Sequence, residues 1–340
     1  GAEVFPGSAL PNAMVQVSPV TKFHSGAGYQ YEDSVIYGFT HTNKGHWNLC
    51  HIPLLPVTGT PTPGDYCSPF SHERESAAPG YYQVFLDRYG VDAQLSSTLR
   101  CAFHKYTYPA GAAPAVLADL QRSNEHVRAW DIRKEGDNVF AGWQQTGEKM
   151  YFYAVANRPV TGIEPVVEGD REVRIVRFGE GDGALELRIG FSFVSEKNAR
   201  ENLEAEMLGK SFAEVRSEAT ATWNDLLGRI RVEGGTEREK GLFYSSLYRS
   251  FHWPALRSDV NGEFTDVDGT VINPGFRYYT GPSYWDDYRN KLILLGMLAP
   301  DVAADVISSD TDKGEKRGGF MPTFFHGDHA SAFVAGTYLR

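Results

Sequence analysis

Hydrophobic and polar positions alternate along the first part of the chain, up to about residue 195. Residues 95, 97, 99, 101 and 103 alternate with polar neighbours, and the runs 81–86 and 150–155 are further short strand candidates. A period of two is typical of β-strands that bury one face. The pattern therefore predicts a mostly β structure for this part of the chain.

Two more alternating runs, 173–175 and 185–193, lie on either side of the segment Gly179-Glu-Gly-Asp-Gly183. A short glycine-rich segment favours a turn, so the sequence predicts a β-hairpin here. Several strands at this spacing, each with one polar face, are typical of an antiparallel β-sandwich.

The spacing of apolar residues changes to three and four between residues 198 and 230, which is the spacing of a helix. We expect two helices there, separated near Gly209. Thr236 followed by Glu239 has the pattern of a capping box and predicts the start of another helix, which carries apolar residues as far as Phe251.

The helix expected over 283–298 organises the second part of the chain. Ser283 and Asp286 have the spacing of a capping box, and the apolar run 292–295 predicts a helix that is buried on most sides. Polar and aromatic side chains then lie in the first turn of a rigid helix, where they could hold a polar ligand: Tyr284, Trp285, Asp286, Asp287, Tyr288 and Arg289. The alternative is a helix cap with a surface pair between Arg289 and an aspartate.

The change of period indicates an α+β protein with more than one domain. We expect an antiparallel β-sandwich domain over 1–196, a helical linker over 197–235 and an all-α domain over 236–340. Further helices are expected near 300–307 and after Asp328, a natural N-cap residue. The helical domain is still in progress at the last residue, so we expect only its beginning in this chain.

Composition excludes some classes of function. The 340 residues carry a net charge of −10 and no run rich in Lys and Arg, which argues against a nucleic-acid partner. No apolar run approaches the roughly 18 residues that a membrane span needs. Three cysteines, Cys50, Cys67 and Cys101, allow one disulfide at most. Because Gly1 is not a natural initiator, an N-terminal leader could have been removed.

The segment 39–51 combines three histidines, a tryptophan, a cysteine and two asparagines. His46, Cys50 and His51 could ligate zinc, although no fourth ligand follows at the usual spacing. A tryptophan between hydrogen-bonding side chains is also suited to stacking on a sugar while its hydroxyls are bound. An irregular loop with satisfied polar groups is the third interpretation.

Two other segments carry candidate chemistry. The acidic residues of the loop 259–268 suggest calcium, but the loop does not match an EF-hand, and a solvated turn is the alternative. Asp328 and His329 could bond a ligand, or Asp328 could simply cap a helix. No nucleophile motif and no phosphate-binding loop is present. Asp286 and Asp287 point about a third of a turn apart on a helix, so they form a poor acid–base pair.

Several motifs, taken in order, resemble glycoside hydrolase family 92. They are Phe5-Pro-Gly-Ser-Ala-Leu-Pro-Asn-Ala-Met-Val-Gln-Val-Ser-Pro19, Gly28-Tyr-Gln-Tyr31, Gly38-Phe-Thr-His-Thr42, Asp259-Val-Asn-Gly262, Tyr284-Trp-Asp-Asp-Tyr-Arg289 and Gly327-Asp-His-Ala330. The resemblance implies an exo-acting, calcium-dependent, inverting α-mannosidase. It also implies an N-terminal β-sandwich, linking helices and an (α/α)6 barrel, with the site between the two domains and a periplasmic, secreted or cell-surface location.

The resemblance also implies roles for particular residues. Trp285, Asp286, Asp287 and Arg289 should line the mannose pocket, together with Asp328 and His329. The sandwich segment His46, Trp47 and Asn48 should shape the leaving-group side, and its sequence resembles the branch that prefers α-1,2 linkages. The acid and base of the family, and most of its Ca²⁺ ligands, have no counterpart in 1–340 and are expected beyond residue 340.

Three hypotheses follow. The first is an α-mannosidase that acts on a mannose-containing glycan, in which the chain 1–340 is inactive without its acid and base. The second is a non-catalytic mannose-binding fragment or scaffold. The third is a different enzyme on the same architecture, such as a sugar phosphorylase, which would require phosphate.

Overall fold

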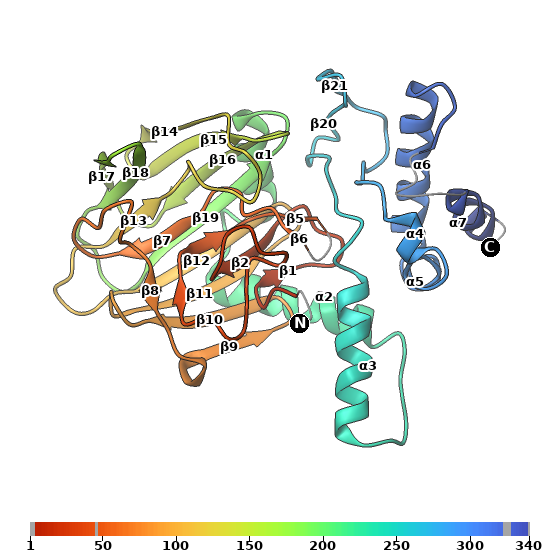
Figure 1. Cartoon of the computed structure of the whole chain (residues 1–340), viewed down its shortest axis with the longest axis horizontal. Coiled ribbons are helices and arrows are strands. Elements are labelled where there is room, and N and C mark those ends of the chain that lie inside the picture. The colour runs from red at the N-terminus through yellow and green to blue at the C-terminus, as the bar shows by residue number, and fades with distance from the viewer. Residues whose placement is uncertain (1–3, 45–46, 322–327, 339–340) are drawn as a thin grey trace.

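A computed structural model describes residues 4–44, 47–321 and 328–338. Figure 1 shows a β-rich part formed by the first half of the chain and a helical part beside it, formed by the end of the chain. The expected α+β architecture, with an antiparallel β domain followed by helices, is confirmed.

Within the described residues, the first large sheet is antiparallel throughout. Its strands, in spatial order, are β1 (Ser8–Ala9), β2 (Gln16–Val20), β4 (Gly38–Thr40), β7 (Leu54–Val57), β13 (Ala115–Ala118), β18 (Arg171–Phe178) and β17 (Val160–Glu168). All residues of β2, β4, β7 and β13 are buried, so the centre of this sheet lies in the core.

The second large sheet is also antiparallel. Its spatial order is β14 (Ala129–Gly136), β15 (Val139–Gln145), β16 (Lys149–Ala156), β19 (Leu185–Ser192), β12 (Cys101–Thr107), β11 (Val91–Ser97), β10 (Tyr81–Leu86) and β9 (Glu75–Ala78). Buried and partly exposed residues alternate along β16, as a strand with one core face requires. The strands expected over 81–86 and 150–155 are therefore confirmed.

Short ladders and one 3-10 turn lie outside the two large sheets. They are β3 (Val35–Ile36) with β8 (Ser68–Pro69), β5 (Asn43–Lys44) with β6 (Trp47–Asn48), β20 (Phe264–Thr265) with β21 (Val271–Ile272), and η1 (His72–Arg74). The ladder of β20 and β21 is beside the helical part (Figure 1).

The structure joins the strands differently from the prediction in two places. The alternating run 95–103 is not one strand, because it turns between β11 and β12, where the Thr98 N–H donates to the Cys101 carbonyl at 2.9 Å. The segment 179–183 does not close a hairpin either. It connects β18 of the first sheet to β19 of the second. Alternation shows that a strand has one buried face, but it does not identify the sheet that the strand joins.

The helices follow the predicted order. They are α1 (Glu196–Glu206), α2 (Phe212–Leu227), α3 (Glu237–Ser250), α4 (Tyr284–Asp287), α5 (Lys291–Leu298), α6 (Pro300–Lys316) and α7 (His329–Tyr338). Thr236 and Glu239 form the expected capping box of α3. The break between α1 and α2 is also where the sequence predicts it, around Gly209.

Helix α1 lies directly on the outer face of the second sheet. A Cβ atom at Gly190 of β19 would lie 2.1 Å from the carbonyl oxygen of Ala199, so only glycine permits this approach. Phe103 of β12 packs there with Leu203 of α1 and Phe212 of α2. The centre of the second sheet is therefore covered on both faces.

A buried carboxylate joins the sandwich, the linker and the loop that leads to α4. Asp259 accepts hydrogen bonds from Ser192 at 2.6 Å, from Asn198 at 2.9 Å and from Asn202 at 2.7 Å. Burial raises the pKa of Asp259, and these hydrogen bonds oppose that rise. The three parts of the chain are thus fastened at one point.

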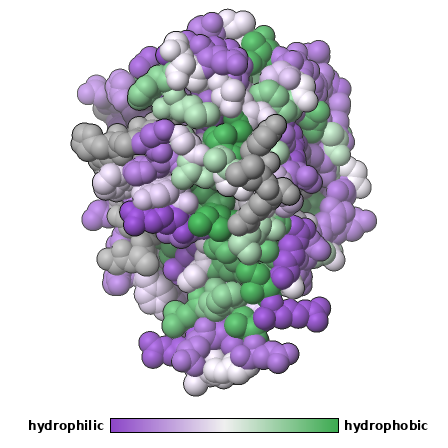
Figure 2. Space-filling model, turned by 90° about the vertical axis from the view of Figure 1, so that its right-hand side faces the viewer, coloured by the Kyte–Doolittle hydropathy of each residue, from purple (hydrophilic) through white to green (hydrophobic). Residues whose placement is uncertain are grey.

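A stripe of apolar surface crosses the helical part, as Figure 2 shows. Leu242 of α3, Ile293 and Met297 of α5, and Phe320 after α6 are exposed large apolar residues. Among the helices that the structure describes, none is both long and apolar enough to cross a membrane. Cys50, Cys67 and Cys101 are all free thiols.

Candidate functional site

The helix expected over 283–298 is two helices in the structure. α4 ends at Asp287, and α5 begins at Lys291 after a turn at 288–290. Asn290 caps α5, since its side-chain oxygen accepts from the Lys291 N–H at 2.5 Å. The expected burial on most sides is also wrong, because α5 buries Leu292, Leu295 and Leu298 but exposes Ile293 and Met297.

The capping box predicted at Ser283 does not form. The Ser283 side chain accepts no backbone hydrogen bond, and its hydroxyl donates to the Asp286 carboxylate at 2.6 Å. The Ser283 carbonyl accepts from the backbone N–H groups of Asp286 and Asp287, at 3.0 Å each. Asp286 therefore keeps an exposed carboxylate that a serine hydroxyl orients.

Aromatic rings from α4 and the turn after it meet the first residue of α7. His329 stacks on Tyr288 with ring centroids 4.3 Å apart and lies 5.6 Å from the ring of Trp285. The Nε2 atom of His329 is buried without a hydrogen-bond partner among the described residues. Trp285 is 46% exposed, so this cluster presents an indole at the surface.

The charged residues around α4 have different partners. Asp287 forms an ion pair with Lys291 at 2.8 Å, and both side chains are mostly buried. The Arg289 guanidinium lies over the Tyr288 ring at 4.8 Å, rather than beside an aspartate. Asp328 accepts from the Ser331 backbone N–H at 3.4 Å, as the N-cap interpretation expects.

The β5–β6 hairpin lies at the side of the sandwich near the helical part (Figure 1), and its Trp47 is 54% exposed. Asn48 is buried instead. Its side-chain oxygen accepts from the Cys50 N–H at 2.7 Å and from Thr40 at 3.3 Å, so that oxygen already stabilises the hairpin. His46 lies outside the described residues.

The cavities lie elsewhere. A cavity of about 560 Å³ is lined by the N-terminal segment, β9, α3 and Lys291. Another, of about 550 Å³, is lined by residues between Gln121 and Arg171. Neither is lined by Trp47, Trp285, Asp286 or Asp287. Neither of these two cavities therefore joins the α4 cluster to the hairpin.

The metal interpretations are not supported among the residues that the structure describes, where no group of three or more His, Cys, Asp or Glu could hold an ion. In the acidic loop, Asp259 is held by the donors described above, Asp266 pairs with Lys316, and Asp268 accepts from the Thr270 N–H at 2.8 Å. These three carboxylates are thus already engaged by other groups of the protein.

One histidine of the segment 39–51, His51, is also fully engaged. His51 contacts Thr42 at 2.7 Å through Nδ1, and both Glu125 and Thr146 at 3.0 Å through Nε2. The hydrogen bond with His51 lowers the pKa of Glu125 to about 2. Burial raises the pKa of the Cys50 thiol, which opposes its use as a thiolate ligand.

Sequence reasoning missed three residues that position this site: Lys291, Asp310 and Lys313. Lys291 pairs with Asp287, and Asp310 and Lys313 lie beneath α4. The spacing of Asp287 and Lys291 at i and i+4 is a signal that could have identified the first pair. Nothing in the sequence connects Tyr284 to Asp310, because they lie on different elements.

Exposed indoles on the sandwich and on the helical part, the latter beside the exposed Asp286, suit a ligand that has both an apolar face and hydrogen-bonding groups. The family model of the glycosyl hydrolase family 92 N-terminal domain matches residues 1–202, and that of the glycosyl hydrolase family 92 catalytic domain matches residues 198–339. The chain belongs to glycosyl hydrolase family 92.

Solved structures of this family have the same fold. The α-mannosidase BT3965 of Bacteroides thetaiotaomicron superposes with a TM-score of 0.90 at 25% identity, over 98% of this chain and 52% of that one. Its complex with mannoimidazole gives the same TM-score and identity. The inverting mannosidase BT2199 of the same organism gives 0.87 at 24% identity, over 98% of this chain and 50% of that one.

A curated relative from Arthroderma benhamiae, described as an uncharacterized secreted glycosidase, is 25% identical over 318 residues. The match covers 77% of this chain and 41% of the relative. The chain therefore spans about half the length, or less, of the proteins that it resembles.

Proposed function

We propose that the whole protein is an exo-acting, inverting α-mannosidase that removes terminal α-mannose from glycans, with a preference for α-1,2 linkages. The observation that carries this proposal is the fold match to a family 92 α-mannosidase over nearly all of the chain, together with the complex of that enzyme with mannoimidazole. An inverting glycosidase displaces the leaving group in one step, with water attacking from the opposite face of the sugar.

The α4 cluster is the proposed sugar-holding surface. Trp285 would stack on the apolar face of the mannose ring, and His329 supports the indole from α7. Asp286 would accept hydrogen bonds from sugar hydroxyls, because its carboxylate is exposed and oriented by Ser283. Arg289 would donate to the same ligand, while Asp287 is held by Lys291.

Asp328 completes this surface at the start of α7. The carboxylate is exposed and close to His329 in the chain, although it also caps the helix through Ser331. We assign it to the edge of the mannose pocket, where a helix N-terminus favours hydrogen bonding to a neutral sugar through its free N–H groups.

The β5–β6 hairpin is the proposed contact for the leaving-group sugar. Trp47 offers an exposed indole, and Asn48 holds the hairpin in shape. His46 belongs to the same segment of the sequence and is assigned to this contact as well. This assignment places the choice of linkage in the sandwich domain and the binding of the terminal mannose in the helical domain.

The described residues are proposed to bind and orient sugar, not to transfer the protons. No pair of carboxylates faces a common described cavity, as an acid and a base for inversion must. We assign the acid, the base and most of the ligands of a family-type Ca²⁺ ion to residues outside 1–340. The chain 1–340 alone is then expected to be inactive, with domains at 1–196, 197–235 and 236–340.

Release of mannose from defined α-linked mannobioses by the full-length protein tests the proposal. We expect hydrolysis without phosphate, faster with the α-1,2 isomer than with the α-1,3 and α-1,6 isomers, and loss of activity on chelation that added Ca²⁺ restores. An α-anomeric first product would contradict inversion, while a strict need for phosphate would favour a phosphorylase.

The second candidate is a non-catalytic mannose-binding fragment or scaffold. It is favoured by the lining of the two cavities described above, neither of which includes an aspartate or a glutamate. Binding of mannobiose by a full-length protein that releases no mannose from any isomer would support it. The curated relative described as secreted supports a location outside the cell for either function.

A further inference from the structure

Helix α4 cannot hold its own geometry. It has only four residues, and Ser283 gives it no side-chain cap. A single helical turn is unstable in isolation, since few hydrogen bonds offset the ordering of its backbone. Contacts from outside the helix must therefore fix the directions in which Trp285 and Asp286 leave the backbone.

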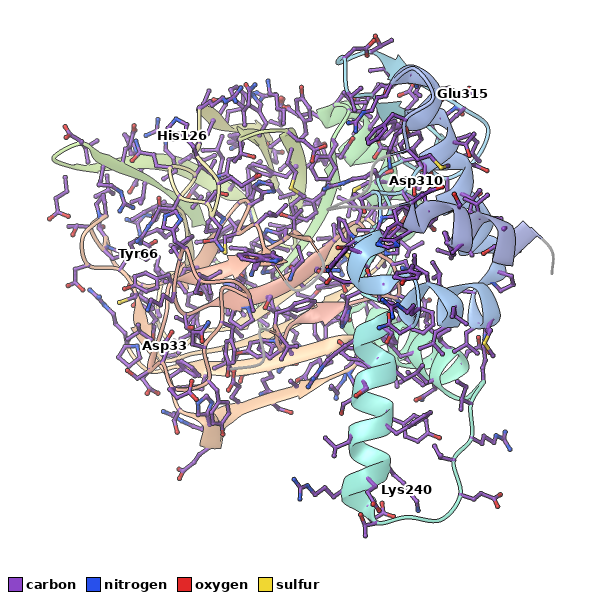
Figure 3. All side chains as sticks on the ribbon, turned by 45° about the vertical axis from the view of Figure 1, so that its right-hand side comes forward. Asp33, Tyr66, His126, Lys240, Asp310 and Glu315 are labelled. Carbon is purple, nitrogen blue, oxygen red and sulfur yellow. The ribbon has the colours of Figure 1, made fainter. Side chains whose placement is uncertain are left out.

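A buried carboxylate of α6 supplies the main contact. Asp310 is fully buried, and the Tyr284 hydroxyl donates a hydrogen bond to it. Lys313 lies one turn further along α6 and donates to Asp310 at 3.1 Å. Figure 3 shows Asp310 within the helical part, on α6. A hydrogen bond to an ionised acceptor is roughly twice as strong as one between neutral groups.

The same pair holds the chain just before α4. Lys313 also donates to the Tyr279 carbonyl at 2.8 Å. A Cβ atom at Gly281 would lie 3.4 Å from the Asp310 carboxylate, so the chain passes directly over this group. The indole of Trp253 donates to the Gly281 carbonyl at 3.2 Å. The segment 279–281 is thus held by Lys313 and by Trp253 before α4 begins.

We propose that Asp310 and Lys313 are positioning residues: through Tyr284 and Tyr279 they set the orientation of α4, and with it the approach of Trp285 and Asp286 to the sugar. This inference rests on the proposed function, because it assigns the sugar to α4. Neither Asp310 nor Lys313 touches the sugar, since both are covered by Tyr284 and the segment before it.

The chain contains a matched control for this arrangement. Tyr278 is as fully buried as Tyr284, and its hydroxyl donates to Asp312 of the same helix at 2.9 Å. Lys316 pairs with Asp312 at 2.7 Å, as Lys313 pairs with Asp310. The two sets differ in that only Tyr284 belongs to α4, and in that Asp312 is partly exposed whereas Asp310 is buried. Removing either hydroxyl takes away one hydrogen bond to a carboxylate of α6, which is buried for Tyr284 and partly buried for Tyr278.

The experiment compares Tyr284→Phe with Tyr278→Phe in the full-length protein. We expect Tyr284→Phe to lower kcat/KM for an α-mannobiose by about tenfold or more, mainly through a higher KM, because the groups that bind the sugar are no longer held in place. Tyr278→Phe should stay within about twofold of the wild type. Thermal unfolding should shift in both variants, and less in Tyr278→Phe, because the hydrogen bond of Tyr278 is only partly buried.

Amide hydrogen exchange tests the positioning without using activity. Exchange at residues 286–288 should become faster in Tyr284→Phe and remain unchanged in Tyr278→Phe. Equal kinetic effects in the two variants, or unchanged exchange in Tyr284→Phe, would overturn the inference. A wild-type protein that neither binds nor cleaves α-mannosides would instead show that the proposed function is wrong, while the exchange result would still decide whether Asp310 positions α4.

Discussion

The role of an individual side chain in this protein depends more on its partners than on its residue type. Asp286 and Asp287 are adjacent and chemically identical, yet one is oriented by a serine at the surface and the other is paired with a lysine. In the same way, His41 is a core residue, although it belongs to the histidine-rich segment that suggested a ligand site. Its Nε2 atom lies 3.0 Å from that of His104.

The two aspartates should respond differently to substitution. We expect Asp286→Ala to lower kcat/KM of the full-length protein by about a hundredfold. The reason is that the carboxylate no longer accepts hydrogen bonds from sugar hydroxyls, either in the bound substrate or in the transition state. Asp287→Ala should mainly lower the melting temperature, since Lys291 loses its partner in a mostly buried position. The reverse pattern in kinetics and thermal unfolding would show that Asp287 holds the sugar.

The buried histidine pair should make stability depend on pH. Burial lowers the pKa of His41 from its ordinary 6.5 to about 3, and it lowers that of His104 as well. Below about pH 6.5 the unfolded chain takes up protons that the folded core excludes, so stability is fully present above that pH and falls towards pH 3. For His41 alone, the loss between pH 7 and pH 5 is about 2 kcal/mol.

Urea unfolding at pH 7 and pH 5 measures this effect. The variant His41→Gln should show a smaller difference between the two pH values than the wild type does. His126→Gln is the matched control, because His126 is exposed. If both variants keep the pH dependence of the wild type, the buried pair is not its source.

At the scale of elements, short pieces of structure carry the proposed site, and longer ones hold them. α4 and the β5–β6 hairpin are each only a few residues long, whereas α6 and the large sheets supply the rigid support. This arrangement is common where loops and short elements bind ligands on a stable scaffold. It also assigns separate tasks to the two elements, which can be tested separately.

A substitution in the β5–β6 hairpin should weaken binding of the leaving-group sugar alone. We expect Trp47→Ala to raise KM for α-1,2-mannobiose by about tenfold, because stacking of a ring on an indole is lost. Hydrolysis of an aryl α-mannoside, which has no second sugar, should stay within about twofold of the wild type. A similar loss with both substrates would place Trp47 against the terminal mannose instead.

At the scale of the whole molecule, the apolar stripe on the helices is the most unusual surface (Figure 2). A soluble protein rarely exposes large apolar residues side by side, so such a stripe indicates a surface that packs against something. The solved relatives are about twice as long as this chain. We therefore expect the full-length protein to cover this face.

Met297, which is 55% exposed here, tests that expectation. A charge placed on a free surface usually changes stability by less than about 0.5 kcal/mol, whereas a charge placed in a packed interface costs about 2 kcal/mol or more. We expect Met297→Lys to destabilise the full-length protein by the larger amount in chemical denaturation. Lys240→Gln on helix α3, which removes only a surface ion pair with Glu237, is a control that should have little effect, and a small effect of both would mean that the stripe is free.

Local signals predicted much of the fold but less of the site. The structure confirms the predicted helix break near Gly209, the helix start at Thr236 and the strands over 81–86 and 150–155. These predictions are correct because caps and alternation depend on residues close in the chain. The aromatic and acidic cluster at 284–289 was identified for the same reason. The residue that supports this cluster, Asp310, was not identified from the sequence, since it is 26 residues away from Tyr284.

Periodicity and capping by themselves determined where most helices and strands occur and that β precedes α, while the short motifs of the sequence carry the resemblance to family 92. Tertiary structure alone decided that 179–183 crosses between sheets, that 288–290 interrupts a helix, and that Asp287 is paired while Asp286 is exposed. The reason is that a residue's secondary structure is set mainly by its neighbours in the chain. Its burial and its partners are set by segments that only folding brings together.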